Sequence, residues 1–227
     1  SVAKGETLLD TVETIEALGA DYVVMRHGSS GSAHFLSPHI RASIINGGDG
    51  THEHPTQALL DAFTIREATG KLKGLKISLV GDILHSRVAR SNILLLTKLG
   101  AQVTLVGPPT LVPEAFEEIG CRIVYTLREG IRDADVIYLL RIQLERMQKN
   151  LFPSLAEYRL LYGLTSDRLA YAKPGALVMH PGPVNRGTEI SREVLDLPQT
   201  LVLDQVTNGV AVRMAVFYLL QGAREHG

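Results

Sequence analysis

The sequence predicts an α/β protein built from two doubly wound parallel-sheet units. Short apolar runs, typical of buried strands, alternate with longer runs of helical periodicity along the whole chain. That alternation favours parallel strands with helices on both faces of each sheet. Gly70 and Gly74 bound a short stretch that we interpret as a hinge between two series of elements, and no internal repeat interrupts either series.

The first series covers residues 1–70. Apolar residues recur every three or four positions in its first helix, and Gly19 supplies a stop. The two strands of the series are compact runs of Val, Ile and Met. Its predicted elements are a helix at 7–18, strands at 22–25 and 43–46, a turn at 47–50 and a helix at 54–69.

The second series begins with the apolar run LKISLV and continues the same alternation to the end of the chain. Its predicted elements are a strand at 75–80, a helix at 86–99, a strand at 102–106, a short helix at 113–119, strands at 121–125, 135–140 and 176–179, and a last helix at about 208–224.

Composition excludes several classes of function. The chain has 227 residues with 23 Lys and Arg against 24 Asp and Glu, which argues against a protein that binds nucleic acid through phosphate contacts. One cysteine, Cys121, allows neither an intrachain disulfide nor a Cys-based zinc site, and a reducing, cytoplasmic location fits best. No apolar run approaches the roughly 20 residues that span a bilayer, so we expect no membrane partner.

The unusual polar residues fall where predicted strands end. Ligands of open α/β sheets bind beyond the carboxyl ends of the strands, so these residues predict a single site. They are Arg26 and His27, then Asp49, His52 and His54, then Gly81, Asp82, His85, Ser86 and Arg87, then Arg141 and Gln143, and finally the HPGP run at 180–183.

The chemistry of this set points to an anionic ligand. Arg26, Arg87 and Arg141 are permanent cations whose planar donor groups suit carboxylates and phosphates. His52 and His54 suggest a metal pair, but on a strand-to-helix turn they need not converge, and no Cys or His partner has metal-ligand spacing. We therefore expect a small, multiply anionic ligand and no metal.

The helix that opens with HPTQ strengthens this expectation. Pro55 suits a first helical turn, where free backbone N–H groups and the helix dipole face a ligand. The alternative, that His54 is only an N-terminal cap, leaves Gln57 in the same turn unexplained. The turn after residue 80 lacks the G-x-G-x-x-G pattern and the chain has no P-loop, so we expect no nucleotide cofactor, and no cofactor of any kind.

These motifs, in their order and spacing, resemble the aspartate carbamoyltransferase catalytic chains over essentially the whole length. The resemblance rests on SVAKGET at 1–7, VMRH at 24–27, GDG at 48–50, HPTQ at 54–57, GD at 81–82, HSRV at 85–88, LRIQ at 140–143, ER at 145–146 and HPGP at 180–183. The sister ornithine enzymes typically have Cys at the position of Thr56 and a His-Cys-Leu-Pro loop in place of HPGP.

The resemblance implies the carbamoyltransferase fold and transfer of a carbamoyl group from carbamoyl phosphate to L-aspartate, in pyrimidine biosynthesis. Residues 1–70, with the helix 207–227 packing back on them, would form the rest of a carbamoyl-phosphate domain, and residues 71–206 an aspartate domain. The implied roles are as follows: Arg26 and His54 catalytic; Arg26, His54, Gln57 and Ser1 for carbamoyl phosphate; Lys4, Arg87, Arg141 and Gln143 for aspartate; and Gly182 and Pro183 as a backbone loop, commonly with a cis proline.

The resemblance also implies a homotrimer, in which Ser1 and Lys4 reach a neighbouring subunit's site, and a regulatory chain or a dihydroorotase as further partners. Chains of this family carry a Ser-Thr-Arg-Thr-Arg phosphate loop before the position of Ser1, so we expect the first domain to be truncated at its N-terminus and the phosphate site to be incomplete. Two alternatives stay open: transfer to another amino acid, and a non-catalytic assembly subunit.

Overall fold

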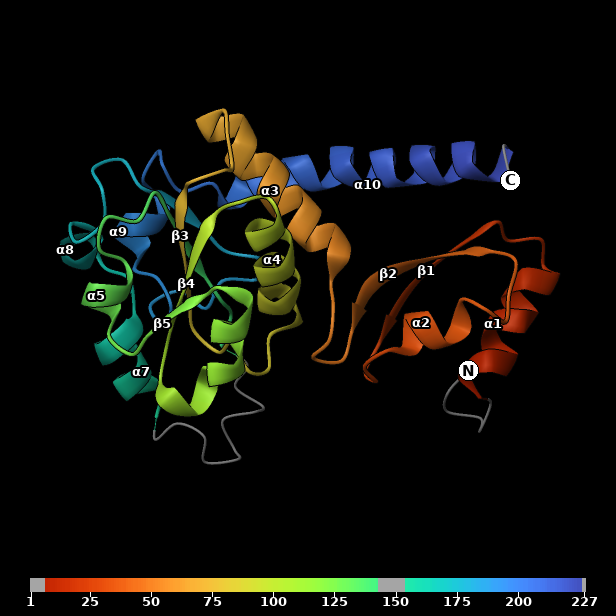
Figure 1. Ribbon diagram of the computed structural model, residues 1–227, viewed down its shortest axis with the longest axis horizontal. Helices are drawn as coiled ribbons and strands as arrows, with labels where there is room; N and C mark the ends of the chain where they lie inside the picture. The colour runs from red at the N-terminus through yellow and green to blue at the C-terminus, as the bar shows by residue number, and fades with distance from the viewer. Residues whose placement is uncertain (1–6, 143–153, 226–227) are drawn as a thin grey trace.

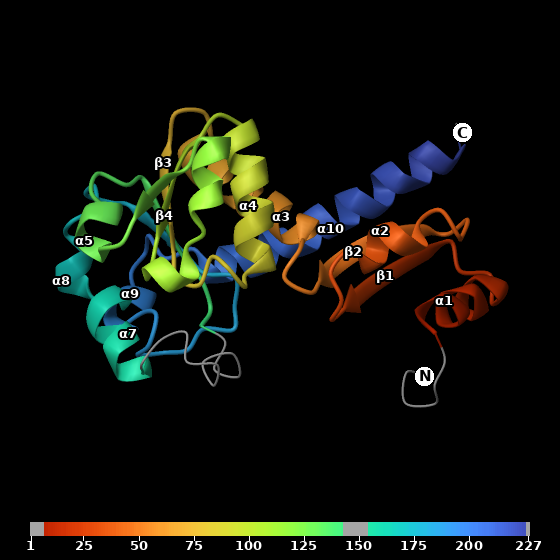
Figure 2. The same ribbon diagram turned by 60° about the horizontal axis from the view of Figure 1, so that its bottom comes forward.

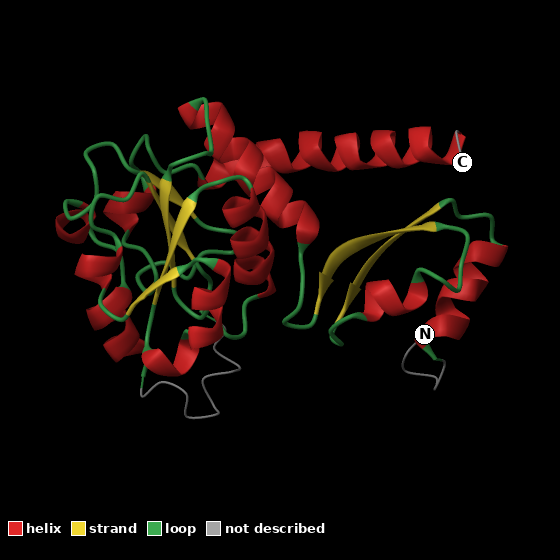
Figure 3. Cartoon of the chain, in the orientation of Figure 1, coloured by secondary structure: helices red, strands yellow, loops and turns green. Residues whose placement is uncertain are grey.

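The computed structural model describes residues 7–142 and 154–225, and it confirms the α/β prediction (Figure 1). The elements fall into two groups, one around a two-stranded sheet and one around a five-stranded sheet. Figure 3 shows the two sheets well apart, with helices around the larger sheet and along one side of the smaller one. Within the described residues no helix is both long and apolar enough to cross a bilayer.

The first group is built on a short parallel sheet. In chain order its elements are α1 (Leu8–Ala17), β1 (Tyr22–His27), α2 (Ser32–Leu36), β2 (Ser43–Asp49) and α3 (Pro55–Thr69). The strands run further than predicted, because pairing continues past a register shift to join His27 with Asp49. Arg26 and His27 therefore lie in β1 rather than after it. Helix α2 was not predicted, since five residues are too few to show a period.

The second group forms a doubly wound sheet in the order β5-β4-β3-β6-β7, with every pairing parallel. Its elements are β3 (Lys76–Val80), α4 (Arg87–Lys98), β4 (Gln102–Val106), β5 (Arg122–Val124), α5 (Leu127–Gly130), β6 (Val136–Leu139), α7 (Leu155–Tyr162), α8 (Ser166–Leu169), β7 (Leu177–Met179), α9 (Arg192–Leu195) and α10 (Val202–Glu225), with 3-10 turns at Pro109–Leu111 and Glu114–Ile119. The strand order reverses between β3 and β6, which is where such sheets bind ligands.

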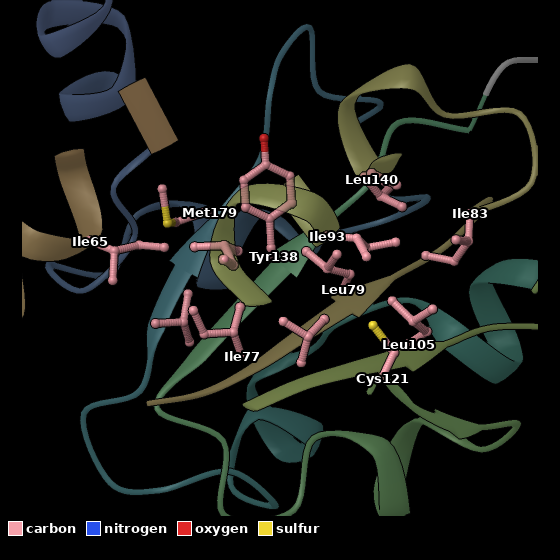
Figure 4. Packing of buried hydrophobic residues seen from close by; sticks show 14 of the residues in the cluster. Ile65, Ile77, Leu79, Ile83, Ile93, Leu105, Cys121, Tyr138, Leu140 and Met179 are labelled. Atoms are coloured by element: carbon pink, nitrogen blue, oxygen red, sulfur yellow. The ribbon is translucent and has the colours of Figure 1, made fainter. Parts of the chain in front are cut away.

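The core of this group explains why its strands are almost continuously apolar. Ile77 and Leu79 of β3 are completely buried and pack with Ile93 of α4 and Leu105 of β4 (Figure 4). Tyr138 of β6 lies at the edge of the same cluster, and its hydroxyl points away from the apolar side chains. A sheet covered on both faces needs apolar side chains on both sides of each strand.

Helix α10 joins the two groups. It begins at Val202, earlier than the predicted residue 208, and runs past α3 towards β1 and β2 in both views (Figures 1 and 2). Near its start Asn208 donates a hydrogen bond to Thr64 of α3, at 3.1 Å. Near its end the ring of Phe217 meets that of Tyr22 edge-on, with centroids 5.4 Å apart. The last helix therefore packs on the first group of elements.

Candidate active site

A cavity of about 520 Å³ lies between the two groups, at the carboxyl ends of β1, β3, β6 and β7. Its walls come from the end of β1, the start of α3, the turn from β3 into α4, and the segments that follow β6 and β7. The residues that line it are Arg26, Gly50, His54, Gln57, Asp82, His85, Ser86, Arg87, Val88, Arg141, Pro181, Gly182, Pro183 and Arg213.

Most of the residues predicted from the sequence meet in this cavity. They are Arg26, His54, Gln57, Arg87, Arg141, Gly182 and Pro183. Ser1, Lys4 and Gln143 lie outside the described residues. One lining residue, Arg213 of α10, was missed. The sequence does hold a signal for it, because Arg213 is the one charged residue in the otherwise uncharged stretch 205–223.

The lining of the cavity is strongly cationic. Arg26, Arg87, Arg141 and Arg213 contribute fixed positive charges from four different elements or segments. Asp82 is the carboxylate of the lining, and it accepts hydrogen bonds from the backbone N–H and the Nδ1 position of His85, both at 3.0 Å. A cavity of this charge suits a ligand with more than one anionic group.

His54 is held in its neutral form. Burial is the largest cause, and the charges of Arg87, Arg26 and Arg213 add to it, so that the pKa of His54 falls from 6.5 to about 4. His54 is the N-cap residue of α3, but its side chain makes no capping hydrogen bond to the helix and lines the cavity instead. Its backbone N–H donates to Ser91 at 2.8 Å, which fixes the start of α3 against α4.

Arg87 reaches from the second group onto the first. Ser86 caps α4 by accepting a hydrogen bond from Ala89, so Arg87 opens the helix with its side chain directed across the cavity. Its guanidinium lies over the backbone of Gly48, where an added Cβ would be 2.7 Å from both Nε and Cζ. Gly48 also has a φ of +120°, which favours glycine. The end of β2 is thus shaped to receive Arg87.

A buried carboxylate organises the loop between β2 and α3. Asp49, 1% exposed, accepts hydrogen bonds from Gly31 and Glu53 backbone N–H groups and from the side chains of Asn46 and His52. Burial opposes ionisation, but these donors hold the pKa of Asp49 at about 2. His52 is therefore directed to Asp49, whereas His54 lines the cavity. Within the described residues no group of three or more His, Cys, Asp or Glu could hold a metal ion.

The segment after β7 closes the cavity from the other side. The peptide bond between Gly182 and Pro183 is cis, as the resemblance implies. The Gly182 N–H donates to Nδ1 of His180 at 2.9 Å, and burial, with the charge of Arg141, lowers the pKa of His180 to about 4. Glu189 ties this segment to the one after β6, since it accepts hydrogen bonds from Asn185 and from the Ile142 backbone.

Comparisons with known proteins agree with this geometry. Residues 73–220 match the family model "Aspartate/ornithine carbamoyltransferase, Asp/Orn binding domain", and residues 1–67 match the model of the carbamoyl-P binding domain of the same family. The chain belongs to the aspartate/ornithine carbamoyltransferase family.

Relatives within this family are close. The aspartate carbamoyltransferase catalytic subunit of Endomicrobium trichonymphae is 56% identical over 226 residues, which cover 100% of this chain and 72% of the relative. The corresponding subunit of Moorella thermoacetica is 59% identical over 222 residues, or 98% of this chain and 72% of the relative.

Solved structures show the same fold. Aspartate transcarbamoylase from Trypanosoma cruzi, in complex with carbamoyl phosphate, is 32% identical with a TM-score of 0.86, and the match covers 96% of this chain and 71% of that one. Ornithine carbamoyltransferase from Pyrococcus furiosus is 30% identical with a TM-score of 0.83, covering 96% of this chain and 72% of that one. The carbamoyltransferase fold expected from the sequence is confirmed.

Proposed function

We propose that this chain is the catalytic chain of an aspartate carbamoyltransferase. It transfers the carbamoyl group of carbamoyl phosphate to the amino group of L-aspartate, giving N-carbamoyl-L-aspartate and phosphate. The observation that carries the proposal is the cavity in which Arg26, Arg87, Arg141 and Arg213 converge around the neutral His54. The relatives named as aspartate carbamoyltransferase catalytic subunits support the choice of aspartate.

The wall formed by β1 and α3 suits carbamoyl phosphate. Arg26 presents a guanidinium to an anion, and the positive end of the α3 helix dipole lies at the same wall. In our proposal Arg26 and His54 polarise the carbonyl group. A neutral imidazole carries one N–H group, which can donate a hydrogen bond to the developing oxyanion. It lacks the second, more acidic proton of an imidazolium ion, which the phosphate could take. Gln57 contacts the carbamoyl end.

The wall formed by α4 and the segment after β6 suits aspartate. Arg87 and Arg141 lie in the same cavity and would each pair with one of the two carboxylates. Ornithine has a single carboxylate, so this pair favours aspartate. Gln143, two residues after Arg141, would add a further hydrogen bond, and Ser1 and Lys4 would enter from a neighbouring subunit.

The reaction needs orientation and charge stabilisation and uses no cofactor. The aspartate amine attacks the carbamoyl carbon, a carbon–nitrogen bond forms, and the carbon–oxygen bond to phosphate breaks. The amine proton passes to the departing phosphate. The arginines hold two anions together that would otherwise repel each other, and the same charges stabilise the oxyanion.

The assignment of one wall to carbamoyl phosphate and the other to aspartate also suggests how the chain is divided into domains. We propose that residues 1–70 belong to a carbamoyl-phosphate domain, together with the helix that packs back on it, and that residues 71–206 form the aspartate domain. The functional unit would be a cytoplasmic homotrimer with shared sites, acting in pyrimidine biosynthesis, with a regulatory chain or a dihydroorotase as further partners.

The test is direct. The full-length protein is incubated with labelled carbamoyl phosphate and either L-aspartate or L-ornithine, and both carbamoylated products are measured. Formation of carbamoyl-aspartate alone supports the proposal. Preferred transfer to ornithine or another amine would show that the acceptor is wrong, and absence of turnover despite binding of carbamoyl phosphate would indicate a non-catalytic subunit.

A further inference from the structure

Asp61 is a completely buried carboxylate that is hydrogen-bonded to Gln57, a residue of the cavity lining. It lies on α3 one helical turn after Gln57, and 0% of its surface is exposed. Its four hydrogen bonds come from four elements: Gln57 of α3 and Gln205 of α10 donate to Oδ1 at 3.0 and 2.7 Å, and Asn92 of α4 and Tyr138 of β6 donate to Oδ2 at 2.8 and 2.7 Å.

All four donors are neutral groups that can either donate or accept a hydrogen bond. The charge state of Asp61 therefore decides which of their atoms face it. Burial raises the pKa of Asp61 to about 6, whereas the four donors directed at its two oxygens favour the ionised carboxylate. An ionised carboxylate only accepts hydrogen bonds and has room for about four of them. Each partner must therefore turn a donor towards it.

This requirement fixes the side-chain amide of Gln57. The amide has a donor end, Nε2, and an acceptor end, Oε1. Because Nε2 is turned to Asp61, the carbonyl oxygen is the end left for a ligand in the cavity that Gln57 lines. Gln57 is 7% exposed, so its side chain has little freedom to turn over without breaking this bond.

A second link fixes the position of the same carboxylate oxygen. Gln205 donates to Oδ1 of Asp61 through Nε2, and its own Oε1 accepts the backbone N–H of His180 at 3.0 Å. His180 precedes Pro181 and Gly182, which line the cavity together with Gln57. Hydrogen bonds therefore connect Asp61 directly to Gln57 and, through Gln205, to the segment that begins at His180.

We propose that Asp61 is a positioning residue that orients the Gln57 amide, so that its carbonyl oxygen accepts a hydrogen bond from the amino group of the carbamoyl donor. The consequence is specificity. A carbamoyl group carries N–H donors where an acetyl group carries a methyl group. A hydrogen-bond acceptor at this point therefore strengthens the binding of the carbamoyl compound and not that of the acetyl compound. The inference rests on the proposed function for the identity of the donor substrate.

The experiment compares two ligands that differ only at that group. Dissociation constants for carbamoyl phosphate and acetyl phosphate are measured with the wild-type protein and with Asp61→Ala. In Asp61→Ala, water can enter the space that the carboxylate leaves. Because water both donates and accepts hydrogen bonds, it can bind either end of the Gln57 amide and does not fix the orientation of that amide. We expect the preference for carbamoyl phosphate to fall about tenfold, the range of one net hydrogen bond.

A loss of positioning changes the ratio of the two dissociation constants. A general loosening of the protein weakens the binding of both ligands equally and leaves the ratio unchanged. The matched control is Thr64→Ala, on the same helix, where a buried hydroxyl also loses its bonds, one of them to Asn208. We expect this control to keep the wild-type ratio. The double variant Gln57→Ala/Asp61→Ala should show the same ratio as Gln57→Ala alone, because Asp61 acts through Gln57.

The inference is overturned if Asp61→Ala weakens both ligands equally, or if the double variant has a lower ratio than Gln57→Ala. Should Asp61→Ala not fold, the wild-type protein labelled with ¹⁵N-glutamine provides the test. Side-chain N–H protons of Gln57, assigned by their loss in Gln57→Ala, should exchange slowly with water, and exchange as fast as in free glutamine overturns the inference. Failure of the proposed function shows instead as absent wild-type turnover.

Discussion

His54 should make the stability of the protein depend on pH in a defined range. Its pKa is lowered from 6.5 to about 4 by burial and by the charges of Arg87, Arg26 and Arg213. The unfolded chain protonates this histidine below about pH 6.5, whereas the folded chain resists protonation until about pH 4. The contribution of His54 to the free energy of unfolding is therefore complete above pH 6.5 and is lost as the pH falls towards 4.

The size of the effect follows from the two pKa values. At about pH 5 the unfolded state is almost fully protonated at His54 and the folded state hardly at all, which lowers the free energy of unfolding by about 2 kcal/mol relative to about pH 7.5. His180 and Asp61 also titrate in this range, with pKa values of about 4 and about 6. They are shared by the wild type and any His54 variant, so a comparison of the two isolates His54.

The assay is urea unfolding of the wild type and of His54→Gln at both pH values, with His34→Gln as the control, since His34 is exposed on α2 and away from the cavity. We expect the wild type and the control to lose about 2 kcal/mol more than His54→Gln on going from about pH 7.5 to about pH 5. Equal losses in wild type and His54→Gln would refute the reasoning, because they would show that His54 titrates alike in the folded and unfolded chains.

Three further predictions concern the proposed site. Arg141→Ala should raise the KM for aspartate by roughly 10–100-fold and change the dissociation constant of carbamoyl phosphate by less than about threefold, as expected for one lost charge-assisted pair; equal weakening of both would contradict the assignment. Gly48→Ala should displace Arg87 and lower kcat/KM at least about tenfold, with a loss of about 1–3 kcal/mol in stability, and a crystal structure of the variant with Arg87 unmoved would disprove this. Lys4→Ala and Arg26→Ala, each nearly inactive alone, should recover about a quarter of wild-type activity when dissociated and reassociated in equal amounts, because one random site in four then takes Lys4 from one chain and Arg26 from another; inactive mixed trimers would exclude a shared site.

The sequence predicts those parts of the molecule in which local pattern and burial agree. The strand at 102–106 is predicted to the residue, and α3 and α4 to within one residue at each end. The polar residues of the site could be found because parallel strands place their carboxyl ends at one edge. The short helices α5, α8 and α9 have four residues each and carry no period, so no pattern could reveal them.

What could not be predicted depends on contacts between distant segments. Arg213 is marked in the sequence as the one charge in an uncharged stretch, but its place in the cavity depends on the packing of α10 along α3, which no local pattern predicts. Gly48 is a turn glycine in the sequence, and its role in receiving Arg87 appears only when the two groups of elements come together. In the sequence Asp61 is only a polar position inside a helix, although in the structure it accepts hydrogen bonds from four different elements.

Three buried carboxylates lie close to the cationic cavity, and their hydrogen-bond partners explain how the two are compatible. Asp49, Asp61 and Glu189 are each 1% exposed or less, and each lies in or below a different wall. Their bound donors are backbone N–H groups, side-chain amides, a tyrosine hydroxyl and a histidine ring rather than guanidinium groups. Had an arginine of the lining paired with one of them, that charge would be neutralised before a ligand arrived. The hydrogen bonds that hold these carboxylates in place thus come from groups other than the arginines of the lining.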